Sequence, residues 1–196
     1  MVADDTRTSP VTINYNVLPT FPVATTVYDF AGVTRNQDEG AYYSNPGVLP
    51  QGFNWFVRQN GTAKPTGRIQ DYLRDDRVGT TDYVYGAKYR EGRFSNAAPE
   101  ADRLEHSGTI SHTVFDVGAN TTRIMVNRGG ALSDDQARTA VMPINNSAAL
   151  PSGTTYEWVN RDGTPLTNKQ VTETGEATRY VKVTLPKTAE DGPAAT

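Results

Sequence analysis

Apolar and polar residues alternate most regularly near the C-terminus, where residues 179–185 read RYVKVTL. Successive side chains of a β-strand point to opposite faces of the sheet, so the three apolar residues of this stretch share one face. Residues 154–159 alternate in the same way and place Tyr156 and Trp158 together. An Asp-Gly pair at 162–163 follows, and these residues tolerate the positive φ of a tight turn. The pattern predicts two half-buried strands with a turn after the first.

The same alternation predicts further strands along the chain. The first covers residues 12–17, with Ile13, Tyr15 and Val17 on one face. The others fall at 25–33, 53–55, 82–85, 109–117 and 121–127.

Short helices are predicted by local signals between these strands. Thr34 and Gln37 have the spacing of a capping box, and Ser133 and Gln136 repeat it. Residues 67–76 form a third candidate, because their apolar residues have i, i+3, i+4 spacing. Those residues are Ile69, Tyr72 and Leu73.

The chain contains two similar stretches about 101 residues apart (49 to 150). Each begins with Leu-Pro-x-Gly, at 49–52 and at 150–153, and continues with a tryptophan, a glycine turn and a strand. The tryptophans are Trp55 and Trp158. The interval from leucine to tryptophan differs by two residues, which keeps the tryptophan on the same strand face. We therefore predict a divergent tandem repeat.

The second copy resembles the Rib/alpha-like repeats of Gram-positive cell-wall-anchored surface proteins. The resemblance rests on Leu-Pro-x-Gly-Thr, Trp, Thr-x-x-Gly and Val-x-Val-Thr-Leu-Pro in order, preceded by ALSDDQA at 131–137, and covers about the last 75 residues. The first copy matches through Leu-Pro-x-Gly, Trp55 and a turn at Gly79. Its longer insertion resembles the long Rib-like form. The resemblance implies a stalk or spacer architecture with no catalytic residues to transfer.

Composition narrows the function classes. The 196 residues are enough for two small domains, and a net charge of −3 with mixed signs leaves no basic surface for nucleic acid or an anionic membrane. The absence of cysteine excludes disulfides. No run of apolar residues is long enough to span a membrane as a helix. We expect an internal fragment of a longer protein.

Residues that could carry chemistry are few. His106 and His112 are the only histidines, and no nucleophile or phosphate-binding glycine motif is present. We therefore expect no enzyme activity, no cofactor and no metal site. Three alternatives stay open: calcium held by acidic pairs such as Asp38-Glu39 and Asp75-Asp76, a sugar stacked on a tryptophan, and a Lys-Asn isopeptide bond. Lysines 88 and 182 are the candidates for that bond, although both alternate outward.

Tyrosine is concentrated in the first copy, which holds eight of the ten. Tyrosine is enriched at recognition surfaces. Candidate ligand-binding residues are therefore Tyr42, Tyr43 and Tyr72. The alternative interpretation is that these aromatics close the insertion and pair across strands.

The sequence as a whole predicts an all-β protein of two tandem Ig-like β-sandwich modules, at 9–104 and 105–190, each with a short helix. The expected function is a non-enzymatic stalk segment of an extracellular, cell-wall-anchored adhesin that projects a distal binding region. Its expected partners are neighbouring repeats, and the chain itself is expected to be a monomer. The alternative function is direct binding of host matrix protein or glycan through the tyrosine-rich first module.

Overall fold

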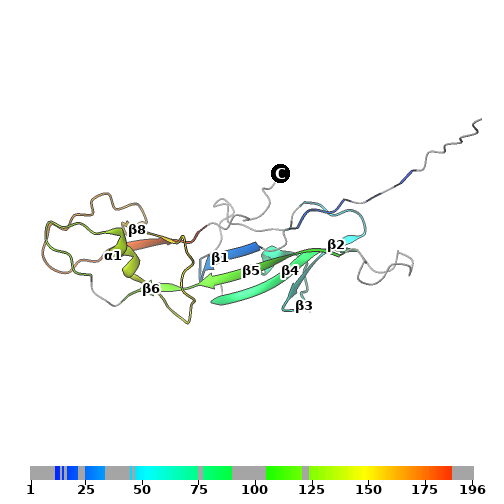
Figure 1. The fold of residues 1–196 in the computed structure, drawn as a ribbon, viewed down its shortest axis with the longest axis horizontal. Helices are drawn as coiled ribbons and strands as arrows, with labels where there is room; N and C mark the ends of the chain where they lie inside the picture. The colour runs from blue at the N-terminus through cyan, green and yellow to red at the C-terminus, as the bar shows by residue number, and fades with distance from the viewer. Residues whose placement is uncertain are drawn as a thin grey trace, which may run out of the picture.

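The computed structural model describes residues 12–13, 15, 17–21, 25–33, 45, 47–74, 77–89, 105–120 and 124–186. These residues form a mainly β structure with one short α-helix among them, drawn out along one axis (Figure 1). The strands are β1 (Thr25–Phe30), β2 (Phe53–Gln59), β3 (Thr62–Ala63), β4 (Gly79–Tyr89), β5 (Glu105–Phe115), β6 (Val117–Ala119), β7 (Val141–Pro143), β8 (Thr155–Val159) and β9 (Tyr180–Thr184). The helices are the 3₁₀ turn η2 (Ile69–Asp71) and α1 (Asp134–Thr139).

One end of the molecule is a five-stranded sheet in the order β1-β5-β4-β2-β3. β5 runs parallel to β1 and antiparallel to β4. The predicted second module begins with this strand, which in the structure pairs with β1 and β4. Alternation along 105–115 shows which side chains face inward but carries no information about which strands lie beside it. The division into modules at residue 104 stays a prediction.

The core of this sheet lies on one face, beneath η2. Its buried side chains are Val27, Val57, Ile69, Leu73, Tyr83, Tyr85 and Ile110. The predicted i, i+3, i+4 stripe is confirmed, since Ile69 and Leu73 are buried and Tyr72 packs against them. Tight 3₁₀ turns are common as short connectors, and here one turn suffices to cover the sheet.

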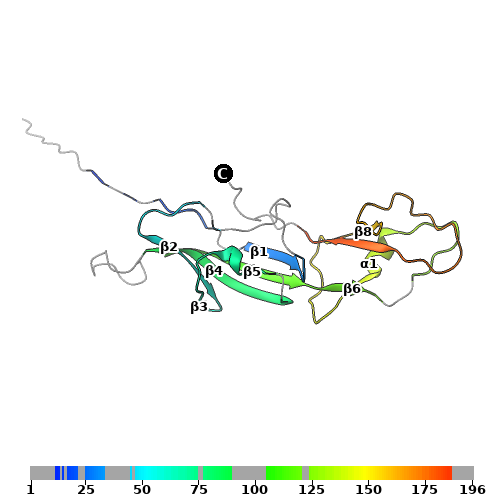
Figure 2. The same cartoon turned by 180° about the vertical axis from the view of Figure 1, so that it is seen from behind.

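The other end contains two antiparallel ribbons, β6-β7 and β8-β9 (Figure 2). α1 begins at Ser133, whose side chain accepts a hydrogen bond from Gln136 N while Gln136 Oε1 accepts from Ser133 N. The predicted capping box is therefore confirmed. Trp158 of β8 is buried against the helix start, and its Nε1–H donates to Ser133 O at 2.8 Å.

The two Leu-Pro-x-Gly motifs form the same turn. Gly52 and Gly153 have φ of 92° and 90°, as the third residue of a type II turn requires. Phe53 N donates to Pro50 O, and Thr154 N donates to Pro151 O, both at 3.2 Å. Each turn enters a strand that pairs antiparallel with a later strand, β2 with β4 and β8 with β9. The local repeat is thus present in backbone geometry.

The two ends are joined by a nearly continuous extended segment, because Asp116 alone separates β5 from β6. Asp116 N donates to Ser147 Oγ at 3.0 Å, and Asp116 O accepts from Ile144 N at 3.1 Å. Its carboxylate accepts from Asn145 Nδ2 at 2.7 Å. The turn after β7 therefore fixes the position of Asp116, between β5 and β6, through these hydrogen bonds.

Other sequence predictions have mixed outcomes. The strand predicted at 25–33 is confirmed as β1 over Thr25–Phe30, and a turn takes the place of its last three residues. Residues 12, 13, 15 and 17 form no strand, and neither do residues 124–127. The prediction of a strand at 121–127 is wrong for its described part, because side chains alternate there without a partner strand beside them. The helix predicted at 34–37 lies outside the described residues.

Candidate functional site

Tyr72 is the predicted ligand-binding residue that the structure describes, and it follows η2 directly. Its ring stacks on Tyr83 with centroids 6.4 Å apart, and Lys64 Nζ lies 5.5 Å from its centroid. Its hydroxyl accepts from Thr66 N at 2.9 Å. The side chain is half-buried. Tyr72 is therefore engaged in contacts within the fold.

Tyr42 and Tyr43 lie outside the described residues, so the structure does not bring the three candidates together. The next described residue, Asn45, donates to Gly67 O at 2.7 Å and accepts from Ile69 N at 2.9 Å. This pair of hydrogen bonds connects the chain after Tyr43 to the loop before η2. The ligand-binding role of the three tyrosines stays a prediction.

Most described tyrosines of the first repeat copy serve packing. Tyr83 and Tyr85 are buried in the core. Tyr28 meets Phe115 edge to face at 5.5 Å, and Tyr89 meets Phe53 at 5.1 Å. Such pairs stabilise sheets beyond the area that they bury. The packing interpretation of the tyrosine bias is favoured by these contacts.

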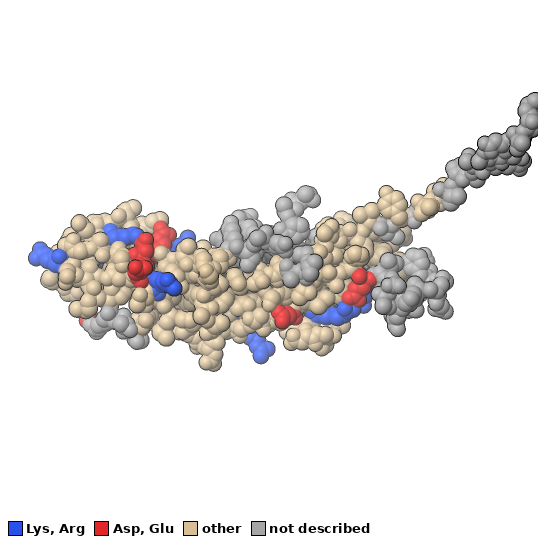
Figure 3. Space-filling model, viewed as in Figure 1, with Lys and Arg blue, Asp and Glu red and all other residues tan. Residues whose placement is uncertain are grey.

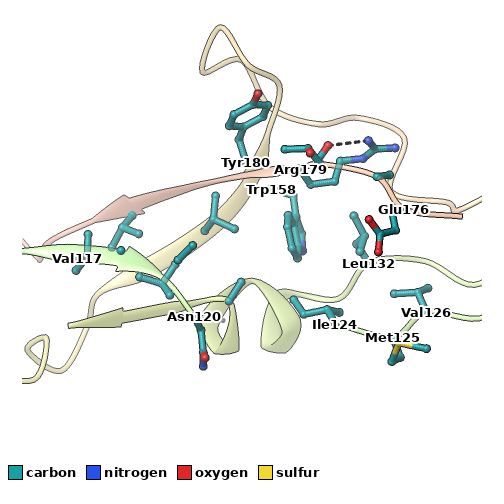
Figure 4. A pocket seen from close by; sticks show the side chains of 18 of the residues that line it. Val117, Asn120, Ile124, Met125, Val126, Leu132, Trp158, Glu176, Arg179 and Tyr180 are labelled. Atoms are coloured by element: carbon teal, nitrogen blue, oxygen red, sulfur yellow. Dashed lines mark hydrogen bonds between the residues drawn. The ribbon is translucent and has the colours of Figure 1, made fainter. Parts of the chain in front are cut away.

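A different feature, the apolar groove, lies between the ribbons β6-β7 and β8-β9 (Figure 4). It encloses about 740 Å³, and its wall includes Trp158, which points into it beside α1. Val117, Ile124, Val141, Val181 and Val183 also line it. The predicted inward valines 181 and 183 are thus half-buried and face this space.

Polar groups of the groove lie toward both ends, with Asn120 on the side of Val117 and two charged residues at the other end. Glu176 and Arg179 lie there, with Arg179 Nη1 donating to Thr178 O at 2.9 Å. The rest of the wall is mostly aliphatic. β6 and β9 each pair with one strand in the described part of the chain, so each leaves one edge unpaired. The groove therefore offers apolar walls and strand edges rather than a set of catalytic groups.

Sequence reasoning missed this groove. A signal was present, since residues 124–126 alternate around Ile124 and Val126 although no strand pairs with them. The alternation was interpreted as a strand within a closed module. In the structure the same residues line an open wall.

Chemistry at the histidines is limited by their positions. His106 is exposed and His112 is buried, six positions apart on β5. At about 3.3 Å per residue they lie about 20 Å apart, too far to share a metal ion. Among the described residues, no group of three metal-ligating side chains occurs. His112 instead contacts Asp29, with Nε2 2.6 Å from Oδ2.

The isopeptide alternative has a partial geometric basis. Lys88 lies opposite Asn54 on β2 and opposite Glu105 on β5. Lys88 is exposed, however, and Glu105 already accepts two hydrogen bonds from Arg58 at 2.5 and 2.7 Å. That pairing raises the pKa of the Arg58 guanidinium above its ordinary value. A hydrated lysine ammonium is a poor nucleophile, so this arrangement does not favour the bond.

Charges on the described surface are mixed. Figure 3 shows basic and acidic side chains in small neighbouring groups, without a patch of one sign on that face. Arg58 with Glu105 and Lys169 with Asp134 are two such pairs. Asp134 also lies in the first turn of α1, where a carboxylate suits the helix dipole.

No helix in the described ranges is long and apolar enough to cross a membrane.

Comparison of the chain with known protein families, with curated proteins and with solved structures finds no match. The resemblance to Rib/alpha-like repeats stays a prediction.

Proposed function

We propose that this chain is a non-enzymatic stalk segment of a bacterial cell-wall-anchored surface adhesin, built from two tandem Ig-like modules that project a distal binding region. The observation that carries the proposal is the junction at Asp116. A stalk needs modules placed end to end with a stiff connection. A single residue between β5 and β6, held by three hydrogen bonds, supports a stiff connection between the large sheet and the two ribbons.

The shape of the described part supports this role. The five-stranded sheet and the two ribbons follow one another along the long axis rather than packing face to face (Figures 1 and 2). Each end has buried side chains of its own, around Tyr85 in the large sheet and Trp158 in the small ribbons. Modules with separate cores extend a molecule without requiring a new interface.

Small-angle scattering on the full chain tests the shape. A compact chain of 196 residues would have a radius of gyration of about 16 Å, and we expect a clearly larger value with a narrow distribution of lengths. Inserting Gly-Ser-Gly-Ser after Asp116 should broaden that distribution. The same insertion in the β2–β3 turn at Asn60-Gly61 is the control and should not. A compact profile for the unaltered chain would end the proposal.

A second experiment separates spacer from binding module. The segment is removed from the surface protein that contains it, and adhesion of whole cells to host matrix is measured. Replacement by an unrelated rigid domain of equal length should restore adhesion if only reach matters. Direct binding through the tyrosine-rich first module predicts no restoration, and that outcome would replace the stalk with the alternative. Tyrosines 28, 83, 85 and 89 pack within the first repeat copy rather than forming a binding surface, which favours the spacer function.

A further inference from the structure

An exposed apolar arm, which the structure describes at residues 12, 13, 15 and 17, lies at the end of the molecule opposite the groove (Figures 1 and 2). Ile13, Tyr15 and Val17 are 77%, 82% and 71% exposed. In an extended chain their spacing places all three on one face. Behind the arm, Phe21 packs edge to face on Trp55 at 5.9 Å, which anchors the point where the arm leaves the sheet.

The apolar groove is the complementary surface. The groove is open to solvent and has a volume of about 740 Å³, and valines, Ile124 and Leu132 make up much of its apolar wall. β6 and β9 contribute residues to its lining, and within the described part of the chain each of them pairs with one strand only. A strand with one apolar face would fill the space with side chains and pair its backbone with the other edge of β6 or β9. β-strand addition of this kind is a common mode of peptide recognition.

We propose that the arm of one copy of this chain inserts as a strand into the groove of a second copy. Six extended residues span about 20 Å, comparable to the five-residue strand β9 that would lie beside them. Residues 11–21 carry no charge, so no ionised group would enter the apolar walls. Glu176 and Arg179 stay at the groove's end.

The arm does not insert into the groove of its own chain, because the two lie at opposite ends of the long axis (Figures 1 and 2). Arm and groove are different surfaces, so the contact is head to tail and leaves one free arm and one free groove on every dimer. Heterologous contacts of this type extend into linear chains. The expectation of a monomer is replaced by this proposal. The stalk role does not depend on it, since a monomer can also act as a spacer.

Sedimentation velocity of the full chain over a concentration series tests the association. The weight-average mass should rise with concentration, and Ile13→Asp/Val17→Asp should abolish the rise. Thr12→Asp/Thr20→Asp adds the same two charges away from the apolar face and is the control. A chain that stays monomeric, or a control that fails equally, would overturn the proposal.

Mixing identifies the groove as the acceptor. Val181→Asp places a carboxylate in the groove wall, so this variant should not self-associate. Mixed with Ile13→Asp/Val17→Asp, it should form a complex that stops at one copy of each, because one intact arm meets one intact groove. Association of the two variants into longer chains, or none when circular dichroism shows both folded, would contradict the assignment.

Binding of a peptide tests the groove without the Val181→Asp variant, in case that variant does not fold. A synthetic peptide of residues 10–20 is titrated into the Ile13→Asp/Val17→Asp chain, and tryptophan fluorescence reports burial near Trp158. Binding should weaken about tenfold or more when the peptide carries aspartate at positions 13 and 17. Equal binding of both peptides, or none of either, would count against the arm.

Discussion

His112 Nε2 lies 2.6 Å from Asp29 Oδ2, and this contact connects β5 to β1 on the inner face of the five-stranded sheet. The two residues are only 2% and 7% exposed. Removing one partner of a buried hydrogen-bonded pair costs about 1–3 kcal/mol, because the remaining polar group stays buried and loses that hydrogen bond. Replacing both with apolar residues avoids that cost. The pair therefore makes a sharp test of the strand order.

We expect His112→Val and Asp29→Val each to lower the free energy of unfolding by about 1–3 kcal/mol, and the double variant to cost less than their sum. Urea unfolding followed by circular dichroism measures these values. The matched control is Ser111→Val with Asp82→Val, a hydrogen-bonded pair at 2.6 Å joining β5 to β4 near the surface. Those changes should each cost under about 1 kcal/mol. Additive single changes at His112 and Asp29 would contradict the pairing.

The two Leu-Pro-x-Gly turns provide a matched comparison. Alanine at Gly52 or Gly153 must adopt positive φ, which costs about 1–2 kcal/mol. At Gly52 the new Cβ would also lie 2.8 Å from the Tyr89 ring, whereas at Gly153 it would meet Pro186 at 3.3 Å. We therefore expect Gly52→Ala to destabilise more than Gly153→Ala in thermal unfolding. The reverse order would show that the turns differ in a way the geometry does not reveal.

The start of α1 depends on Ser133. Ser133→Ala removes the acceptor for Gln136 N, and losing such a cap costs about 0.5–2 kcal/mol. Ser133→Asp keeps a side-chain acceptor and should retain most of the stability. Trp158 fluorescence reports the change locally, because its Nε1–H donates to Ser133 O. If both variants lost the same stability, the side-chain cap would not be the main contribution of Ser133, and its backbone contact to Trp158 would be.

Asp162 supplies a titration test in the turn after β8. Its carboxylate accepts from Thr164 Oγ1 at 2.7 Å and Thr164 N at 3.0 Å. These bonds lower the pKa of Asp162 below its ordinary value, the hydroxyl contributing most. The turn contact is therefore present above the ordinary aspartate pKa and is lost as pH falls through the lowered one.

Thr164→Val should raise the pKa of Asp162 toward its ordinary value without restoring it, since the backbone donor remains. Carbon-13 NMR titration of the Asp162 carboxyl group in the variant and in the unaltered chain measures this change. An unchanged pKa in the variant would rule out the hydroxyl as the main cause.

Sequence reasoning succeeded where the determinant is local. The turns at Gly52 and Gly153, the cap at Ser133 and the alternation of Val181 and Val183 each depend on residues within a few positions. The strand at 105–115 shows the limit. Its inward residues were identifiable from their spacing, but its place between β1 and β4 depends on pairs up to 85 positions apart, such as Thr25 with Ile110.

The groove shows the same limit of sequence reasoning, because its residues were predicted to face inward but the space between them was not predicted. Trp158, Ile124 and Val181 were each assigned inward-facing positions or strands, and each does line one space. Apolar spacing does not reveal how many strands close around that space. The arm at 12–17 was likewise predicted as a strand from its alternation, although it has no partner strand among the described residues.

The parallel pairing of β1 with β5 determines how this chain would respond to mechanical tension. A pull between residues before Thr25 and residues after Phe115 draws the start of β1 and the end of β5 in opposite directions. Six register pairs, Thr25 with Ile110 through Phe30 with Phe115, then share the load at once. The strands must slide past each other in shear, with the His112–Asp29 contact in the same seam, instead of separating one bond at a time.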